Sequence, residues 1–231
     1  MKMFHKVITG AIGMAGVVML ATSTAQAQNL LTDPGFEMQI SAPNPNPNGV
    51  PGWANFGGAN FSQTYAHSGS WSLYTPDNGG GYSVPGTYQD FAASPGETFT
   101  FSGWVYTPNV LPAGDNDFAI LQLSFFTGAP PNNYAGGTGL GAFGVDVGSP
   151  AGTPPAGTVP LPQGVWTYAS VTATAPATTA SMGAYILDIN ADANADFYFD
   201  DMSLTVPEPT SLALSALGLL GLPLFFIRRR K

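Results

Sequence analysis

Apolar and polar side chains alternate along several stretches of the chain, which is the pattern of β-strands buried on one side. In residues 97–106 (ETFTFSGWVY), Phe99 and Phe101 fall on one face, while Trp104 and Tyr106 fall on the other. No stretch between residues 29 and 205 shows a convincing helical period. The same alternation predicts strands at residues 118–126, 165–176, 181–189 and 197–206.

Two of these runs carry polar residues among apolar ones. In FAILQLSFF, Gln122 lies on the face opposite Leu121. In SMGAYILDI, we expect Tyr185 and Leu187 to form the core face, with Asp188 pointing away from it.

Turn signals rich in Pro, Gly and Asn separate the runs, at residues 94–96, 109–114 and 162–164. Several antiparallel strands at this spacing are typical of two packed sheets. The sequence therefore predicts an all-β fold, a single jelly-roll β-sandwich over residues 28–205.

Two segments of this domain lack a clear strand pattern. Ser41–Gly52 alternates Pro and Asn and is predicted to be an extended surface loop. Thr127–Gly164 is rich in Gly and Pro and is unusually long for a loop inside a compact domain. It either contains a short strand around Ala142–Val147 or is a functional or mobile insertion.

The N-terminus has the three parts of a secretory signal peptide. Two Lys residues precede an apolar, small-residue stretch at Val7–Ala21, and an A-x-A cleavage sequence follows at residues 25–27. Residues 1–27 are therefore assigned to a signal peptide, exported through the Sec translocon. The alternative, a retained membrane anchor, is disfavoured because the apolar run is short.

The C-terminus joins an apolar run to a basic cluster. Residues 211–227 carry no charge and would span about 25 Å as a helix, at ~1.5 Å per residue, which suffices for a thin bacterial membrane. Residues 228–231 (RRRK) would lie on the cytoplasmic side. This predicts one short transmembrane helix at 211–227 and a basic tail, with the sandwich outside.

The charges are distributed unevenly along the chain. It has 6 Lys and Arg, all at its two ends, and 14 Asp and Glu, of which only Glu208 lies outside residues 28–205. Because phosphate contacts need Lys or Arg, nucleic-acid binding by this region is excluded, and so is an Arg clamp for anionic sugars. The chain has no cysteine, which excludes disulfides. Any buried carboxylate here needs hydrogen bonds or a metal ion.

The V-P-E-P sequence at residues 206–209, the apolar run and the basic cluster together resemble the PEP-CTERM sorting signal of Gram-negative bacteria. The resemblance implies recognition by exosortase, a membrane cysteine-type transpeptidase, with processing near Pro207, Glu208 and Pro209. It also implies transient anchoring in the inner membrane, then a place on the cell surface or in the extracellular matrix, and association with exopolysaccharide and biofilm production. Residues 206–231 are assigned to this signal; the alternative is an ordinary single-pass anchor.

Several motifs of the predicted sandwich occur in a fixed order, among them NLLTDPGFE at 29–37, AHSGSWSLYT at 66–75 and FYFDDMSLT at 197–205. In this order they resemble the CenC-type carbohydrate-binding modules, within the galactose-binding-like jelly rolls. The resemblance implies a structural calcium ion, a glycan-binding face in many members and no catalytic apparatus. The long insertion at 127–164 departs from that pattern.

Carboxylates in the first and last of these motifs are the candidate metal ligands. The resemblance assigns calcium binding to Glu37 and Asp200, with Asp201 as the alternative and main-chain carbonyls of HSGSWSL as further ligands. The first and last strands of a jelly roll are neighbours, so these carboxylates can meet, and calcium takes about six to eight oxygens. The alternative is that they are solvated surface groups.

Aromatic, amide and carboxylate side chains on the expected strand surfaces are candidates for a sugar site. Sugars stack their apolar ring faces on aromatic rings and exchange hydrogen bonds with amides and carboxylates. We expect Trp104, Tyr106, Gln122 and Asp188 to line such a surface. The alternative for Trp104 is packing within the fold.

The sequence favours a binding protein over an enzyme. Asp115 with Asp117, and Asp188, Asp192 and Asp196, are spaced as carboxylate pairs that could hydrolyse glycosides, but an acidic surface offers such pairs by chance. No G-x-S-x-G, H-E-x-x-H or P-loop sequence occurs. We therefore expect an exported, non-enzymatic protein that binds glycan or exopolysaccharide. The alternatives are a structural or adhesive biofilm-matrix protein without sugar binding and, third, a glycoside hydrolase.

Overall fold

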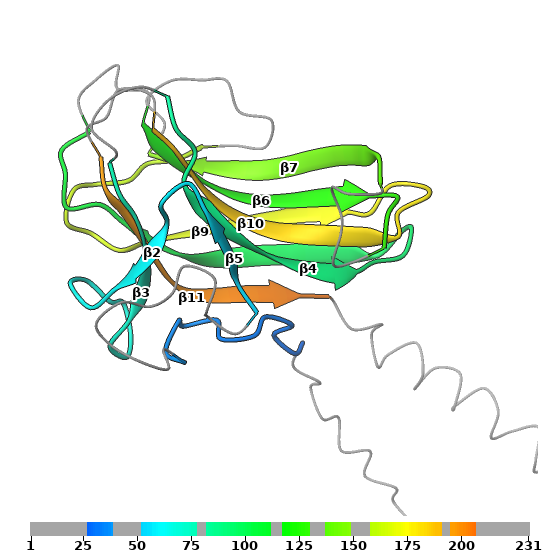
Figure 1. The fold of residues 1–231 in the computed structure, drawn as a ribbon, viewed down its shortest axis with the longest axis horizontal. Helices are drawn as coiled ribbons and strands as arrows, with labels where there is room; N and C mark the ends of the chain where they lie inside the picture. The colour runs from blue at the N-terminus through cyan, green and yellow to red at the C-terminus, as the bar shows by residue number, and fades with distance from the viewer. Residues whose placement is uncertain are drawn as a thin grey trace, which may run out of the picture.

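Two β-sheets pack face to face in this protein (Figure 1). Sheet A has six strands in the order β1-β4-β10-β6-β7-β8, and sheet B has five in the order β2-β3-β11-β5-β9. The structure is a computed structural model that describes residues 27–38, 52–77, 82–111, 117–129, 137–148, 158–190 and 195–206, and no helix occurs in these ranges. The predicted all-β sandwich of two sheets is thus confirmed.

Pairing is antiparallel throughout both sheets, except between β7 and β8. The strands of sheet A are β1 (Ala54–Phe56), β4 (Gly86–Ala92), β6 (Phe118–Phe126), β7 (Gly139–Val147), β8 (Thr158–Val159) and β10 (Ser181–Ile189). The strands of sheet B are β2 (Asn60–Ser62), β3 (Ser72–Thr75), β5 (Thr98–Tyr106), β9 (Thr167–Thr174) and β11 (Phe197–Thr205).

The chain crosses repeatedly from one sheet to the other. It does so at each step from β3 to β6 and again at each step from β9 to β11. These crossings are typical of jelly-roll sandwiches, in which strands distant in the sequence become neighbours. As a consequence, β4, β6 and β10 lie side by side in sheet A.

Alternation along the strands separates the core from the outer faces. In β5, Phe99 and Phe101 are buried between the sheets, whereas Thr100 on the outer face shares a 2.9 Å hydrogen bond with Thr172 of β9. The rings of Phe99 in sheet B and Phe125 in sheet A are 6.1 Å apart, so the two sheets contact directly. Each fully buried aromatic side chain of this kind stabilises the fold by about 1.5–3 kcal/mol.

The expected core face of β10 is wrong. Ala184 and Ile186 have no exposed surface and belong to the core cluster, whereas Tyr185 and Leu187 lie on the outer face of sheet A. Apolar residues occupy successive positions of this strand, so alternation alone does not show which face is covered. Asp188, two residues after Ile186, therefore points into the core.

The long Gly/Pro-rich segment contains a strand. β7 covers Gly139–Val147, starts earlier than the expected Ala142–Val147 and pairs with β6 along its length. Residues 130–136 and 149–157 lie outside the described residues, as do 39–51, which include most of the Pro/Asn-rich loop.

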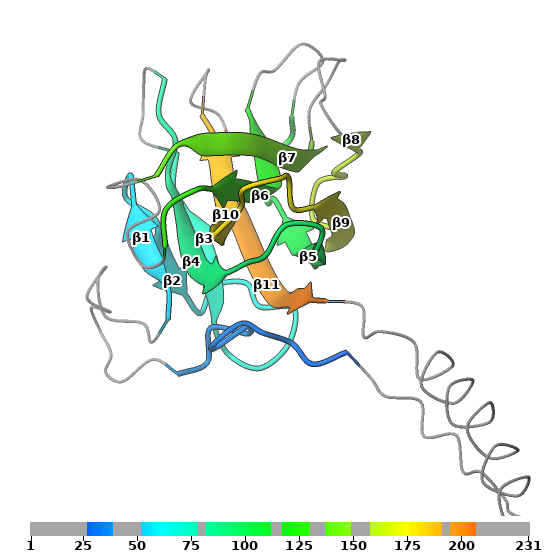
Figure 2. The same cartoon turned by 90° about the vertical axis from the view of Figure 1, so that its right-hand side faces the viewer.

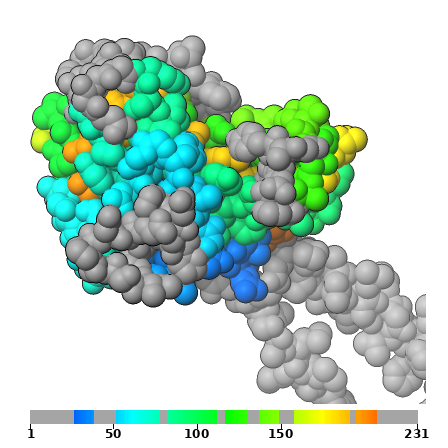
Figure 3. Space-filling view, in the orientation of Figure 1, coloured from blue at the N-terminus to red at the C-terminus, as the bar shows by residue number. Residues whose placement is uncertain are grey.

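The N-terminal segment runs beside the last strand, as expected for the two ends of a jelly roll (Figure 2). The main-chain N–H of Leu30 donates to the carbonyl of Leu204 over 2.8 Å, and the Asn29 amide donates to the Met202 carbonyl over 2.9 Å. In the space-filling view this blue segment packs against the cyan residues that follow it (Figure 3). There the Trp53 indole donates to the Asp33 carbonyl over 2.9 Å.

Both predicted targeting segments lie largely outside the residues that the structure describes. Residues 1–26 of the signal peptide, and 207–231 with the expected span at 211–227, lie outside the described residues. Within the part of the chain that the structure describes, no helix is long and apolar enough to cross a membrane.

Candidate functional site

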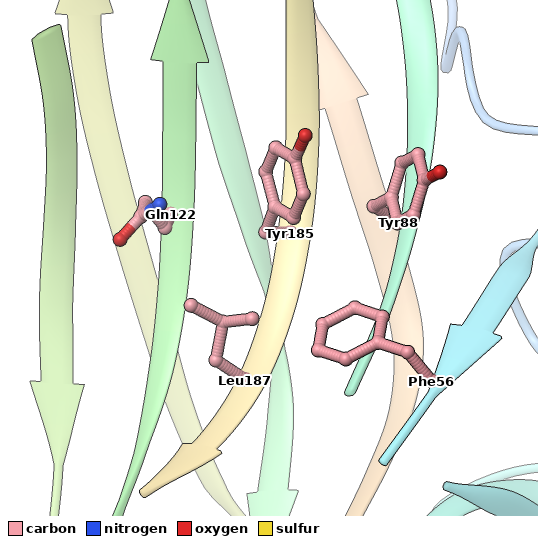
Figure 4. Close-up of a pocket in the computed structure, with 5 residues that line it drawn as sticks. All are labelled: Phe56, Tyr88, Gln122, Tyr185 and Leu187. Atoms are coloured by element: carbon pink, nitrogen blue, oxygen red, sulfur yellow. The ribbon is translucent and has the colours of Figure 1, made fainter. Parts of the chain in front are cut away.

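A pocket of about 410 Å³ opens on the outer face of sheet A. Four neighbouring strands, β1, β4, β6 and β10, contribute to it. Its lining residues are Phe56, Tyr88, Gln122, Tyr185 and Leu187 (Figure 4). The volume falls within the range of about 300–1,000 Å³ that is common for small-ligand sites.

Strand register builds this pocket in two rows. Tyr185 pairs with Gln122 of β6 on one side and with Tyr88 of β4 on the other. In the next row, Gly86 of β4 lies between Leu187 and Phe56. Directly paired residues of an antiparallel sheet point to the same face, so these side chains project from one surface.

Three aromatic rings form one wall of the pocket. The rings of Tyr88 and Tyr185 are stacked, with centroids 5.0 Å apart and planes inclined by 21°. The ring of Phe56 is tilted against Tyr88 at 6.2 Å. Figure 4 shows the two tyrosine rings side by side, with Leu187 and Phe56 next to each other below them. The wall thus presents flat apolar surface, in which Tyr185 is only 3% exposed and its hydroxyl is buried.

Glycines allow the side chains to approach the sheet. A Cβ atom on Gly86 would lie 2.9 Å from Cζ of Phe56 and closer still to the Ile186 carbonyl oxygen. A Cβ atom on Gly183 would lie 2.9 Å from Cζ of Tyr185, so the tyrosine ring covers this glycine. The small residue at each position therefore makes room for a ring of the pocket.

Polar groups lie next to the aromatic wall. The Gln122 side-chain Nε2 donates to Oγ of Ser124 over 2.8 Å, which fixes the direction of the amide. Ser124 pairs with Gly183, and Gly183 pairs with Asp90 on its other side, so Ser124 and Asp90 share the outer face with Gln122. Of these groups, the Gln122 amide lines the pocket, and Ser124, which is 5% exposed, holds that amide in place.

The electrostatic surroundings of the pocket are acidic. No Lys or Arg occurs between residues 28 and 205, and the single His of that region, His67, contacts Asp201 of β11 in sheet B. An anionic ligand would find no cationic partner in the sandwich and would be repelled by its Asp and Glu residues. The pocket therefore suits a neutral ligand.

The four predicted sugar-binding residues do not lie together. Gln122 lines the pocket of sheet A. Trp104 and Tyr106 project from β5, on the outer face of sheet B and so on the opposite side of the sandwich. Asp188 is fully buried between the sheets. The expectation of one surface formed by all four is wrong, because β5 and β6 belong to different sheets.

The face of sheet B around Trp104 is covered by the loop of residues 63–71, between β2 and β3. The ring of His67 stacks on Trp104 with centroids 4.2 Å apart, and that of Tyr65 lies 4.7 Å from Tyr106. Trp166, just before β9, packs 5.2 Å from Tyr106. Trp104 and Tyr106 are half-buried by these contacts, which are those of packed side chains.

Asp188 differs from the other predicted residues because it contacts no solvent. Its exposed fraction is 0%, and neither carboxyl oxygen makes a hydrogen bond. Burial raises the pKa of Asp188 to about 8, with smaller contributions from the neighbouring aspartates 117, 196 and 77. The sequence-based expectation of an outward-facing Asp188 is wrong. Asp188 lies two residues after Ile186 in β10, so its side chain points to the same inner face as that core residue.

The three predicted calcium ligands meet at the 63–71 loop. Oε1 of Glu37 accepts main-chain hydrogen bonds from Ser70 and Trp71 over 2.7 and 2.8 Å. Oδ2 of Asp200 accepts the main-chain N–H groups of His67 and Ser68 over 2.7 and 3.0 Å.

Asp201 is the third carboxylate that contacts this loop. One of its oxygens lies 2.6 Å from Nδ1 of His67, and the other accepts the Ser68 hydroxyl over 2.7 Å. Asp201 adopts a φ of 47° at an irregularity in β11, which lets it follow Asp200 onto the same loop. Burial raises the pKa of Asp200 to about 6, opposed by its main-chain hydrogen bonds.

The arrangement at the loop satisfies these carboxylates without an ion. The described residues contain no group of three or more His, Asp or Glu side chains placed to hold a metal. The residue types suit calcium, but the observed geometry does not form a cage around one. Calcium binding by Glu37, Asp200 and Asp201 stays a prediction from the family resemblance.

Sequence reasoning missed four of the five lining residues of the pocket: Phe56, Tyr88, Tyr185 and Leu187. The sequence does hold a signal, since a glycine stands two positions before each tyrosine, in GTY and in GAY. That spacing leaves room for a ring on the same face. It does not show that β4 and β10 pair.

The tail of the chain matches a known motif. Residues 205–231 match the PEP-CTERM protein-sorting motif, which confirms the resemblance seen in the sequence. The match covers the tail and not the sandwich. No curated protein matches the chain.

Several solved structures resemble the sandwich. A structure described as Family 16 Carbohydrate Binding Module-2 is 20% identical, with 77% of this chain and 99% of that chain covered and a TM-score of 0.49. TmCBM61 in complex with β-1,4-galactotriose is 14% identical, with 78% and 99% covered and a TM-score of 0.47. The CBM22-1 xylan-binding domain from Paenibacillus barcinonensis Xyn10C is 16% identical, with 67% and 85% covered and a TM-score of 0.38.

These identities and TM-scores are too low to transfer the ligands of those proteins to this chain. What the sequence match establishes is confined to the tail: the chain carries a PEP-CTERM sorting signal at residues 205–231.

Proposed function

We propose that this protein is exported and binds a neutral glycan in the pocket on sheet A. The observation that carries the proposal is the stacked pair of Tyr88 and Tyr185, with the amide of Gln122 beside it in the same row of the sheet. An aromatic surface next to fixed hydrogen-bonding groups matches a sugar ring, which has apolar C–H faces and a rim of hydroxyls.

Binding would use each part of the pocket differently. The tyrosine rings and Leu187 would cover the apolar face of one pyranose ring and exclude water from it. Gln122 would exchange hydrogen bonds with its hydroxyls and so distinguish a sugar from a purely apolar ligand. Affinity for a single sugar unit would be modest, because few groups contact it, so repeated units of a polymer would add avidity.

The charge of the sandwich selects among polysaccharides. With no Lys or Arg in residues 28–205, uronic-acid and sulfated polymers would meet only like charge. Neutral exopolysaccharide is therefore the favoured ligand class. The sorting motif at the C-terminus supports the same setting, because it implies export and exosortase processing.

The pocket supports binding rather than hydrolysis. Its lining contains two tyrosines, a phenylalanine, a leucine and a glutamine. Glycoside hydrolysis ordinarily uses two carboxyl groups on opposite sides of the scissile bond. The lining provides no such pair, which favours a role in retaining or organising polysaccharide.

A polysaccharide screen tests this proposal. The full chain, kept in a mild detergent because of its apolar ends, would be run in affinity gels containing neutral glucans, galactans or xylans, or acidic polymers. We expect at least one neutral polymer to retard the protein and the acidic polymers not to. Retardation only by acidic polymers, or by none of a broad neutral panel, would refute glycan binding in the pocket and leave the structural matrix role.

A further inference from the structure

One end of the sandwich holds buried acidic groups that the glycan pocket does not use. β3 and β10 end there, and β6 and β11 begin there. Asp188 near the end of β10 and Asp117 just before β6 both have no exposed surface. We call this region the Asp188 end.

The carboxylate of Asp188 has no hydrogen-bond partner at either oxygen. The Thr75 hydroxyl lies close enough to Asp188 to lower its pKa against the larger effect of burial, but it donates its one hydrogen to the carbonyl of Phe197 over 3.3 Å. A buried carboxylate without donors is costly for a fold, whether it is charged or forced to hold a proton. Such a group would be stabilised by a ligand that the surrounding residues do not provide.

The neighbours of Asp188 increase this cost. The side chains of Asp117, Asp196 and Asp77 lie close enough to raise its pKa, in addition to the effect of burial. No Lys or Arg exists in residues 28–205 to offset the charges. A cation from solution is therefore the remaining source of positive charge.

The Asp188 end also offers further oxygen ligands. Asn190 is 1% exposed, and its Nδ2 donates to the carbonyl of Pro76 over 3.5 Å, so Oδ1 is the acceptor end of its amide. The Thr75 hydroxyl oxygen remains an acceptor after donating to Phe197. Asp196 already accepts the Tyr74 hydroxyl over 2.8 Å. Oxygens alone, with no sulfur or imidazole, select a hard cation.

We propose that the Asp188 end binds a hard divalent cation, Ca²⁺ in an exported protein, through the carboxylates of Asp188 and Asp117 and the amide oxygen of Asn190. This site is separate from the calcium site predicted at Glu37 and Asp200. There the carboxylates already accept main-chain N–H groups, whereas neither carboxylate oxygen of Asp188 accepts a hydrogen bond. The cation would join β6 to β10 and neutralise the buried charge.

Calcium titration of matched variants tests the site. The full chain in detergent would be stripped with EGTA and then titrated with CaCl₂, and its melting temperature Tm would be followed. At calcium about 100-fold above Kd, the folding equilibrium constant should rise about 100-fold and Tm by about 5–10 °C. In a Glu37→Gln background, which disables the separately predicted site, this rise should persist, and adding Asp188→Asn should abolish it.

The order of stabilities distinguishes a cation site from a buried acid. In EGTA, Asp188→Asn should melt above the wild type, because it removes the unpaired carboxyl group; in saturating calcium the order should reverse. If the Tm of Asp188→Asn differed from that of the wild type by the same amount with and without calcium, the proposal would be overturned. If Asp188→Asn does not fold, the calcium-induced rise in Glu37→Gln decides: retention supports the Asp188 end, and complete loss overturns it.

Discussion

The ring of Tyr185 lies on the ring of Tyr88 at 5.0 Å, although the two residues belong to strands far apart in the sequence. The pair exists because β10 inserts between β4 and β6, with Tyr185 in register with both Tyr88 and Gln122. A single register thus places two rings and an amide in one row. A slip of β10 by one residue would turn Tyr185 to the face opposite Tyr88 and Gln122.

Gln122 should contribute to ligand binding and little to folding. Gln122→Leu keeps the approximate volume but removes the amide, so each lost hydrogen bond should weaken glycan affinity by about 0.5–1.5 kcal/mol, a factor of roughly 2 to 12. Titration calorimetry with the polymer found in the screen would measure this. Ser170→Ala, at an exposed position of β9, is the control, and an equal loss in both variants would contradict the assignment.

Gly86→Ala should damage both the pocket and the fold. The added methyl group would meet Phe56 Cζ and the Ile186 carbonyl oxygen, and such overpacking costs about 1–3 kcal/mol. The matched control is Gly139→Ala at the start of β7, where an added Cβ meets nothing within 4 Å. Urea unfolding would compare them; equal stabilities would show that the close approach at Gly86 is not required.

Trp104→Ala should lower stability and leave glycan binding unchanged. Trp104 stacks on His67 at 4.2 Å and packs against Tyr168 at 5.5 Å, on the face of sheet B opposite the pocket. Loss of a large half-buried aromatic side chain should cost about 1–3 kcal/mol. Affinity gels and thermal melts would separate the two effects. Loss of binding in a folded Trp104→Ala protein would place the sugar site on sheet B instead.

In the presence of EGTA, stability should fall as pH rises because of Asp188. The folded state holds the pKa of Asp188 at about 8, above its ordinary value of 3.8. Between about pH 4 and 8 the folded protein therefore binds a proton that the unfolded chain has released. Each pH unit in this window should cost at most about 1.4 kcal/mol for this group.

The control for the pH dependence is Asp188→Asn, which cannot titrate at this position. Its free energy of unfolding, from urea titrations at pH 5 and pH 8, should change less than that of the wild type. Equal changes in the two proteins would show that Asp188 does not titrate across this window.

The sequence predicted those strands whose two faces differ in polarity. In β5, the polar Thr100 and the apolar Phe101 lie on opposite faces, so the sequence shows which face is the core face. The structure buries Phe101 as predicted. In β10 both faces are apolar, because Ile186 packs in the core while Tyr185 and Leu187 line the pocket. Alternation therefore does not show which face of β10 is buried, and the predicted core face was the wrong one.

The two candidate sites differed in how far the sequence could predict them. Glu37 and Asp200 lie in motifs at the two ends of the domain, and the neighbouring ends of a jelly roll bring them to one loop. The pocket instead depends on the pairing of β4, β6 and β10. Such long-range register is set by the whole fold and leaves no local pattern.

The most direct test of glycan binding on sheet A is the affinity of a variant that lacks both stacked rings. Tyr88→Leu with Tyr185→Leu would be compared with the wild type and with Tyr168→Leu, which removes a tyrosine exposed on sheet B. Titration calorimetry of the full chain with the retained neutral polymer should show binding for the wild type and for Tyr168→Leu. The double variant, with near-UV circular dichroism confirming its fold, should bind at least about 10-fold more weakly. Unchanged affinity in a folded double variant would contradict the account.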